Sequence, residues 1–415
     1  MQARTRRTST IGALLLAALA AAGSGEGGAS RLAAQAGRPD FTPVTALLKD
    51  LVSEGVVAGA VAGVHRDGAR LYLEAVGQRD RVSAAPMMPD TLFRIYSMTK
   101  PVTAVVVMQL VTEGKASLDT AVSQFLPEFA GVRVAPDGGT GRPPARPVTV
   151  RDLLLHTSGL SHRTSDLYRS LGVRSRADDL PTFIRKITAA PLMEDPGTRF
   201  RYSEASTVLG RLVEVWTGEP FDRVVQQRLL TPLKMTDTVF WVGPADRGRL
   251  ATVYTGRPGS GLQPVEPEAV PFTERPALME GAVGLVSTVP DYLRFAQMLL
   301  NGGQLDGVRI LPESVVATMV RDGLSPEVRG LRGGRMGWGL ANVDVADAPS
   351  RSGAPTVAGE YGWDGTAGTI FWNDPSTRTA VVLMTQHQPA NPGGIRERFK
   401  AAVVEALKDP GVWRN

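Results

Sequence analysis

The sequence predicts a mixed α/β (α+β) fold, in which one antiparallel sheet is flanked by two terminal helices and a mainly helical subdomain is inserted between its strands. Two observations predict the sheet: the chain begins with a helix pattern followed by two strand patterns, and it ends with two strand patterns followed by a helix pattern. A third observation, the composition, predicts a globular protein with a large core. The chain has 415 residues, of which 43% are hydrophobic and 21% are charged.

The N-terminal part of the predicted sheet follows a short helix. Apolar residues recur at helical spacing over Thr42–Glu54, and Gly55 ends that pattern. The segments Val56–His65 and Arg70–Val76 are strand-like, and Asp67-Gly68 between them is a typical turn pair. This region is therefore predicted to be a helix followed by a hairpin.

The C-terminal part repeats these elements in the opposite order. Gly368–Trp372 and Thr379–Thr385 are strand-like and are joined by the turn Asn373–Ser376, and Ile395–Leu407 has the pattern of an amphipathic helix. We expect the two hairpins to share one antiparallel sheet that the two terminal helices cover.

The middle of the chain is predominantly helical in pattern. Helices are predicted over Pro101–Glu113, Val150–His156 and Ser203–Trp216, the first and last being stopped by glycines. Loops are predicted over Ala135–Pro147 and Gly256–Pro276, as surface connections or as segments that frame a substrate.

These patterns predict one domain over residues 37–415. Its sheet subdomain would comprise about residues 37–96 and 285–415, and its helical subdomain about residues 97–284.

Residues 1–36 have the layout of a secretory signal peptide. Met1–Arg7 is positively charged, Ile11–Ala22 is apolar, and Ala34-Gln35-Ala36 is one candidate cleavage site. Twelve apolar residues are too few to span a bilayer of about 30 Å, so no stable membrane anchor is expected. The mature chain, starting near residue 23 or 37, is predicted to be periplasmic or secreted from a bacterium.

Composition also excludes several kinds of chemistry. The chain has no cysteine, which rules out thiolate catalysis, disulfides and cysteine-ligated metals. The net charge is +5, of which +3 falls in the first 36 residues, so a nucleic-acid partner is not supported. The chain has four histidines, His65, His156, His162 and His387. Their spacing is not that of metal ligands, and we expect neither a metal nor another cofactor.

The motif that indicates catalysis is S-x-x-K, present as Ser97-Met98-Thr99-Lys100 at the start of a predicted helix. Residues three apart share a helix face, so the amine can approach the hydroxyl, and a helix N-terminus supplies N–H groups where an oxyanion can form. Lys100 can act as a base only if its environment lowers its pKa. The alternative is that Ser97 only caps the helix and Lys100 is solvated.

The sequence resembles the serine β-lactamase-related family, which includes class C β-lactamases, D-alanyl-D-alanine carboxypeptidases and family VIII carboxylesterases. Phe93–Thr103 is similar to the nucleophile segment of that family. Leu153–Leu160 resembles its L-L-x-H-T-S-G-L segment, Phe200–Glu204 its F-x-Y-S segment and Gly284–Asp291 its G-L-x-S-T-x-x-D segment. The resemblance covers about residues 40–405 and implies a β-lactamase-like fold.

The resemblance also implies roles for individual residues. Ser97 would be the acylated nucleophile, Lys100 its proton acceptor and Tyr202 the hydroxyl that relays a proton to the leaving group. Gly362–Thr366 aligns with the third motif of the family, just before the strand that begins near Gly368. The backbone N–H groups of Thr366 and Ser97 would then form the oxyanion hole.

Two departures from the lactamase pattern bear on the substrate. Glu204 replaces the asparagine that contacts the acyl side chain, and Trp363, Asp364 and Gly365 replace Lys-Thr-Gly, whose cation binds the carboxylate of the ligand. A lost charge-assisted hydrogen bond costs about 1.5–3 kcal/mol. These four positions are therefore predicted to bind substrate and to favour a neutral ester over an anionic ligand.

The function predicted from these observations is an exported serine hydrolase that acts through a Ser97 acyl-enzyme on a small-molecule ester or amide, and most readily on small neutral esters. One alternative is a β-lactamase or D-alanyl-D-alanine carboxypeptidase in which Arg329, Arg332 or Arg335 replaces the missing lysine. A second is an inactive scaffold that binds peptides or cell-wall fragments.

Overall fold

The computed structural model describes residues 39–136, 139–257, 261–334, 336–348 and 355–408. The elements below belong to one unit, Phe41–Leu407. The predicted signal peptide, residues 1–36, lies outside the described residues, and the division of the unit into sheet and helical subdomains stays a prediction.

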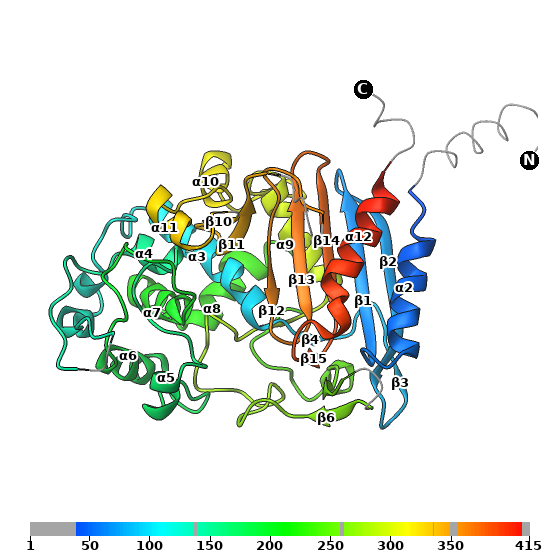
Figure 1. The fold of residues 1–415 in the computed structure, drawn as a ribbon, viewed down its shortest axis with the longest axis horizontal. Helices are drawn as coiled ribbons and strands as arrows, with labels where there is room; N and C mark the ends of the chain where they lie inside the picture. The colour runs from blue at the N-terminus through cyan, green and yellow to red at the C-terminus, as the bar shows by residue number, and fades with distance from the viewer. Residues whose placement is uncertain (1–38, 137–138, 258–260, 335, 349–354, 409–415) are drawn as a thin grey trace, which may run out of the picture. The chain divides into compact units, whose positions relative to one another are not determined.

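An antiparallel sheet of eight strands forms the centre of this unit, in the order β10-β11-β12-β13-β14-β1-β2-β3 (Figure 1). The N-terminal hairpin β1–β2 pairs directly with the C-terminal hairpin β13–β14, because β1 lies antiparallel to β14 with Val61 opposite Met384. The predicted sharing of one sheet is confirmed. The strands are β1 (Gly59–Arg66), β2 (Ala69–Asp80), β3 (Ala85–Pro86), β10 (Met336–Gly339), β11 (Val343–Ala346), β12 (Tyr361–Gly365), β13 (Thr369–Asp374) and β14 (Thr379–Met384).

The sequence patterns missed β10, β11 and β12. The third motif, Gly362–Thr366, precedes the strand near Gly368 as predicted, but its own strand was not predicted. Most of it is β12, which pairs with β13 so that Trp363 stands opposite Phe371. The motif is therefore held by ladder hydrogen bonds on a strand of the main sheet.

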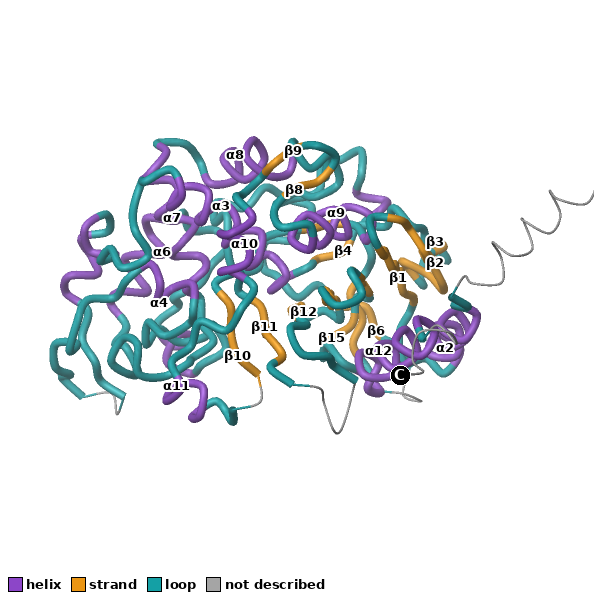
Figure 2. Tube along the Cα trace, turned by 90° about the horizontal axis from the view of Figure 1, so that it is seen from above, coloured by secondary structure: helices purple, strands orange, loops and turns teal. Residues whose placement is uncertain are grey.

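Helices cover both faces of the sheet. The terminal helices α2 (Thr42–Ser53) and α12 (Ile395–Leu407) pack side by side on one face, and α9 (Val289–Leu300) lies on the other (Figures 1 and 2). The residues of β1 from Gly59 to Val64 are consequently all buried, which explains their continuous apolar sequence.

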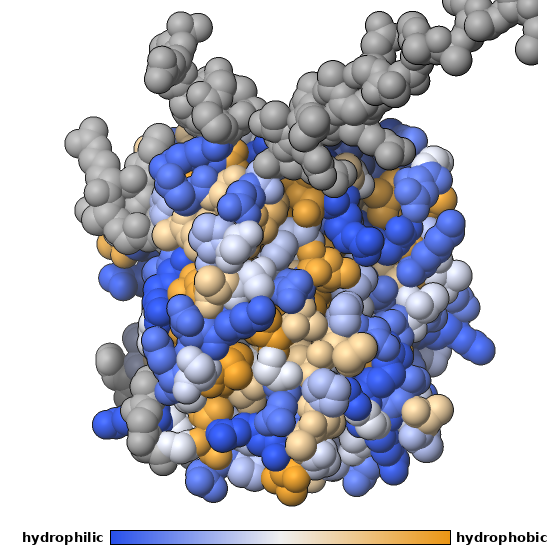
Figure 3. Space-filling view, turned by 90° about the vertical axis from the view of Figure 1, so that its right-hand side faces the viewer, coloured by the Kyte–Doolittle hydropathy of each residue, from blue (hydrophilic) through white to orange (hydrophobic). Residues whose placement is uncertain are grey.

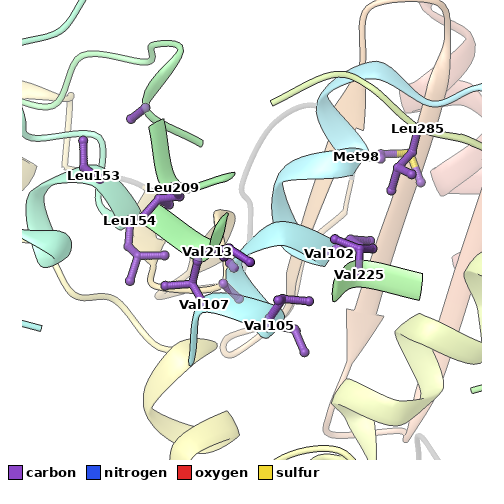
Figure 4. Packing of buried hydrophobic residues seen from close by; sticks show 14 of the residues in the cluster. Met98, Val102, Val105, Val107, Leu153, Leu154, Leu209, Val213, Val225 and Leu285 are labelled. Carbon is purple, nitrogen blue, oxygen red and sulfur yellow. The ribbon is translucent and has the colours of Figure 1, made fainter. Parts of the chain in front are cut away.

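Helix α3 (Thr99–Thr112) runs through the core of the helical region. Its side chains are buried on nearly every side, as expected for a helix surrounded by other elements. Figure 4 shows Val105 and Val107 of α3 among apolar side chains of neighbouring segments, including Val213. Gly114, with a φ of 80°, ends the helix as a left-handed cap.

Seven further helices belong to the described part of the unit. They are α4 (Val150–Leu154), α5 (Asp166–Ser170), α6 (Leu180–Ala189), α7 (Ala205–Thr217), α8 (Phe221–Val225), α10 (Glu313–Met319) and α11 (Pro326–Leu331). Among them, α7 and α8 contact α3. Short 3₁₀ turns occupy Tyr96–Met98, Val122–Gln124, Pro127–Gly131, Arg247–Arg249 and Pro392–Gly394, and a π turn occupies Gln226–Leu230.

Three small sheets supplement the main one. They pair β4 (Phe93–Arg94) with β7 (Val286–Ser287), β8 (Gln304–Leu305) with β9 (Val308–Arg309), and β5 (Val253–Thr255) with β6 (Gln263–Val265) and β15 (His387–Gln388). The predicted loop Gly256–Pro276 therefore contains a strand, β6.

The sheet ends at β3, which is only two residues long and offers little backbone for another strand to pair with. Figure 3 looks onto the side of the molecule where the sheet ends, and hydrophilic side chains cover much of that face between smaller hydrophobic areas. Among the described residues, no helix has the length and apolar character needed to cross a membrane.

Candidate active site

Ser97 lies in the 3₁₀ turn Tyr96–Met98 that leads into α3. Backbone pairing of β4 with β7 fixes the segment before it, and the hydroxyl of Tyr292 donates to the Met98 carbonyl at 2.8 Å. Tyr96 has a φ of 42°, a left-handed conformation that costs a bulky residue energy and that tends to occur at functional sites. The hydroxyl of Ser97 is thus presented from a tightly held turn.

Lys100 is fully buried beside Ser97. Its Nζ lies 3.4 Å from Oγ of Ser97 and donates to the carbonyl of Ala282 at 3.0 Å. Burial lowers the pKa of Lys100 to about 7, with a smaller lowering from Arg163 and an opposing effect of Glu204. The condition set for a lysine base, a strongly lowered pKa, is met.

Tyr202 completes a cluster with these two residues. Its hydroxyl is hydrogen-bonded with Ser97 and accepts a bond from Nε1–H of Trp363 at 3.0 Å. Nζ of Lys100 lies 4.6 Å from the centre of its ring. Burial raises the pKa of Tyr202 above its ordinary value, so the phenol is protonated near neutral pH.

His156 holds the segment that carries Tyr202. The N–H of Ser203 donates to its Nδ1 at 3.2 Å, the N–H of Arg201 donates to its carbonyl at 2.8 Å, and its ring lies 4.8 Å from that of Tyr202. Burial lowers its pKa well below the ordinary value, so the imidazole is neutral. Helix α4 ends before His156, which has a φ of 55°.

Glu204, two residues after Tyr202, is fully buried beside the guanidinium of Arg163 and the imidazole of His162. Nη1 of Arg163 lies 3.7 Å from its Oε1, and Nε2 of His162 lies 4.0 Å away. Burial by itself would raise the pKa of Glu204, but the positive charges of Arg163 and Lys100 outweigh that effect and hold it below the ordinary value. Glu204 is therefore a carboxylate.

The third motif reaches the cluster through Trp363. Its ring lies 5.2 Å from that of Tyr202 and stands at 90° to the ring of Trp338, 4.6 Å away. Asp364 accepts a hydrogen bond from Nη1 of Arg396 at 2.7 Å. The charge of Asp364 is thus compensated by a residue of α12 that the sequence patterns did not single out.

The end of β12 meets the nucleophile segment. A Cβ on Gly365 would lie 2.4 Å from the carbonyl oxygen of Ile95, so only glycine permits this approach. Thr366 follows directly and is exposed. The oxyanion-hole role of the Thr366 and Ser97 N–H groups remains a prediction.

The arginines considered as substitutes for the missing lysine have other partners. Arg329 pairs with Asp322 at 3.2 Å. Arg332 pairs with Asp344, and its guanidinium lies 4.3 Å from the centre of the Phe200 ring. The third candidate, Arg335, lies outside the described residues. Within the described part of the chain, no group of three or more metal-ligating side chains comes together.

Sequence reasoning missed Arg163 and Arg396. Arg163 follows the L-L-x-H-T-S-G-L segment and contacts the site only because that segment folds back over Tyr202 and Glu204. Arg396 lies in a helix whose exposed face is rich in charge, so neither residue type nor spacing distinguishes it from solvated neighbours.

The fold and this cluster define a serine hydrolase, and the chain belongs to the Beta-lactamase family, whose model matches residues 44–406. The chain is 34% identical over 364 residues to Protein Rv1367c of Mycobacterium tuberculosis, covering 83% of this chain and 89% of the relative. It is also 34% identical over 367 residues to the esterase EstB of Burkholderia gladioli, covering 82% and 88%.

A solved structure shares this fold. EstCE1, described as a hydrolase with promiscuous acyltransferase activity, superposes with a TM-score of 0.78 at 27% identity, over 90% of this chain and 99% of its own. The family thus contains esterase relatives, and also penicillin-binding and carboxypeptidase relatives. Small-molecule substrates follow from these relationships.

Proposed function

We propose that this serine hydrolase is an exported carboxylesterase that hydrolyses small neutral esters through an acyl-enzyme on Ser97. The observation that carries the proposal is the buried amine of Lys100, 3.4 Å from the hydroxyl of Ser97 and with a pKa of about 7.

Lys100 is the better base of the two candidates beside Ser97. At pH 7 a pKa of about 7 leaves roughly half of the amine unprotonated, whereas an ordinary lysine would be neutral in about one molecule in 3,000. The pKa of Tyr202 is raised, so its phenolate is scarce at this pH. Tyr202 is accordingly assigned to donating and relaying protons rather than to removing the first one.

The reaction then has two halves. In acylation, the Ser97 proton passes to Lys100 as Oγ bonds to the ester carbonyl carbon. The C–O bond to the alcohol breaks, and Tyr202 delivers a proton to the departing oxygen, itself reprotonated from Lys100. In deacylation, water loses a proton to Lys100 as its oxygen bonds to the acyl carbon. The bond between that carbon and Oγ of Ser97 then breaks, Lys100 returns the proton to Oγ, and the carboxylic acid leaves. The N–H groups of Ser97 and Thr366 would stabilise the oxyanion in both halves.

The surroundings of Trp363 favour a neutral substrate. A tryptophan stands where a cation would bind a carboxylate, and Arg329, Arg332 and Arg396 are each paired with an acidic side chain. An anionic β-lactam or peptide would have to compete with those acids for a guanidinium, whereas a neutral ester need not.

The acyl side of the substrate is assigned to Glu204. Oε2 of Glu204 and Nη1 of Arg163 are buried and have no hydrogen-bond partner among the described residues. Buried polar atoms without partners carry a free-energy cost that a substrate group can relieve. A substrate whose acyl part both donates and accepts a hydrogen bond would satisfy the two atoms together.

Export rests on the pattern of residues 1–36 alone. N-terminal sequencing of the protein recovered from the periplasm or medium of an expressing bacterium should give a start near residue 23 or 37. Recovery only from the cytoplasm with Met1 intact would contradict export and leave the esterase proposal standing.

The test of the catalytic proposal is turnover of p-nitrophenyl butyrate and of a chromogenic cephalosporin by purified wild type, Ser97→Ala and Ser53→Ala, a control at an exposed serine of α2. We expect ester turnover to exceed cephalosporin turnover by orders of magnitude and to vanish in Ser97→Ala only. Preferred cephalosporin turnover would overturn the substrate assignment, and an active Ser97→Ala protein would overturn the mechanism.

A further inference from the structure

Arg396, near the start of α12, binds three groups at the end of the β12–β13 hairpin. Its Nη1 donates to Oδ2 of Asp364 at 2.7 Å, and its Nη2 donates to the carbonyls of Gly365 at 2.7 Å and Thr369 at 3.3 Å. One planar guanidinium therefore connects the last residues of β12 with the first residue of β13, a geometry that lysine cannot reproduce.

The position of Arg396 is itself fixed. Its backbone N–H donates to Oδ1 of Asn391 at 3.0 Å, and its side chain is 13% exposed. A buried fork with three acceptors holds its orientation much better than a surface ion pair does.

The groups that Arg396 holds lie next to the reacting centre. Gly365 touches the Ile95 carbonyl so closely that a Cβ would lie 2.4 Å from that oxygen, and Ile95 is two residues before Ser97. Asp364 is close enough to Lys100 for their charges to interact. Displacing the strand end would therefore displace Thr366 relative to the nucleophile.

We propose that Arg396 is a positioning residue for the hydrolysis, holding the turn after Gly365 so that the Thr366 N–H stays directed at the oxyanion, and compensating the Asp364 carboxylate that would otherwise oppose it. This inference rests on the proposed function. Preorganised donors stabilise developing charge only when their position is fixed, and an uncompensated carboxylate nearby has the opposite effect.

The experiment compares Arg396→Gln, Asp364→Asn, the double variant and Arg396→Lys with the matched control Arg398→Gln. Arg398 lies on the same helix, 41% exposed, with its Nη1 3.9 Å from Glu54. Each protein is assayed for kcat and KM with p-nitrophenyl butyrate, for melting temperature, and for the rate at which a fluorophosphonate probe labels Ser97.

We expect Arg396→Gln to lower kcat and the labelling rate by about 10- to 100-fold with KM changed less than about threefold, because the loss falls on the transition state. Removing the uncompensated carboxylate should restore part of the rate, so the double variant should be at least about fivefold faster than Arg396→Gln. Arg396→Lys should be intermediate, and Arg398→Gln should match wild type.

A folded Arg396→Gln protein with wild-type kcat would overturn the proposal, as would a double variant no faster than the single one. If Arg396→Gln does not fold, Arg396→Lys decides, since a wild-type rate in that variant would contradict the need for the fork. If wild type is labelled at Ser97 but hydrolyses no ester, the esterase proposal fails, and the labelling rates still test Arg396.

Discussion

The indole Nε1–H of Trp363 donates a hydrogen bond to the phenolic oxygen of Tyr202 at 3.0 Å. A tyrosine oxygen that accepts this bond directs its own proton elsewhere, and Ser97 is the other hydrogen-bonding partner of Tyr202. Trp363, which the sequence resemblance aligns with the lysine of the lactamase motif, is thus placed to orient the proposed proton relay.

Trp363→Phe should therefore lower kcat for p-nitrophenyl butyrate by up to about tenfold, the equivalent of one neutral hydrogen bond. The ring that packs on Trp338 is largely kept, so the melting temperature should change little. Trp241→Phe, at a ring contacted by Arg275, serves as the control. An unchanged kcat in Trp363→Phe would show that the bond does not orient Tyr202.

The pH dependence of kcat/KM should follow the titration of Lys100. A base must be unprotonated, so activity should be high above pH 7 and decline as the pH falls through the pKa of about 7. The measurement is initial rate at low substrate between pH 5 and 9 in buffers of constant ionic strength. A profile that is flat across this range would be inconsistent with Lys100 as the base.

The buried pair Arg163–Glu204 should shift that midpoint in opposite directions. Arg163 lowers the pKa of Lys100 and Glu204 raises it. Arg163→Gln should thus move the acid limb of kcat/KM to higher pH, and Glu204→Gln should move it to lower pH. Shifts of the same sign in both variants would contradict this electrostatic assignment.

Lys100→Met should abolish turnover while stabilising the fold. Because the pKa of Lys100 is lower in the folded state, the unfolded chain binds the proton more tightly. The folded state therefore loses stability, relative to the unfolded chain, as the pH falls from about 10.5 towards 7. Removing the buried amine should raise the free energy of unfolding at pH 7 by about 1–4 kcal/mol. Urea denaturation with exposed Lys115→Met as control measures this, and a less stable Lys100→Met protein would refute it.

Asp291 should also make the stability of the fold depend on pH. Burial raises its pKa to about 6, so the folded state holds the proton more tightly and loses this stabilisation as the pH rises from about 4 through 6. Asp291→Asn keeps an acceptor for the N–H of Asp237, which donates to the carboxylate at 2.8 Å.

The stability gain of Asp291→Asn over wild type should therefore grow between pH 4 and 7 to about 1–3 kcal/mol. Thermal unfolding at several pH values measures the difference. Asp50→Asn, at an exposed carboxyl on α2, should show no such trend, and a constant difference for Asp291→Asn would be evidence against the raised pKa.

Much of the site was accessible from the sequence because its residues occur in short local patterns. Ser97 and Lys100 share one helix face at a spacing of three, and their approach follows from helix geometry. Tyr202 joins them in the structure as the resemblance implied, although its part in catalysis stays a proposal. The terminal hairpins were predicted because their strands are long and contain β-branched residues.

The remainder depends on packing that no local pattern encodes. β10 and β11 have four residues each, and β10 is Met-Gly-Trp-Gly, which lacks both alternation and β-branched residues. Arg396 reaches Asp364 only because α12 crosses the sheet beside the end of β12. Such contacts are set by tertiary structure and leave no periodic trace in the sequence.

The pairing of β1 with β14 has a consequence for synthesis. Arg66 and Thr379 stand opposite each other across this pair although 313 residues separate them. These two strands can join only after nearly the whole chain has left the ribosome, and pairings this distant in sequence form slowly. Until β14 is synthesised, β1 lacks a partner along one side, so the two terminal hairpins can form a single sheet only late in translation.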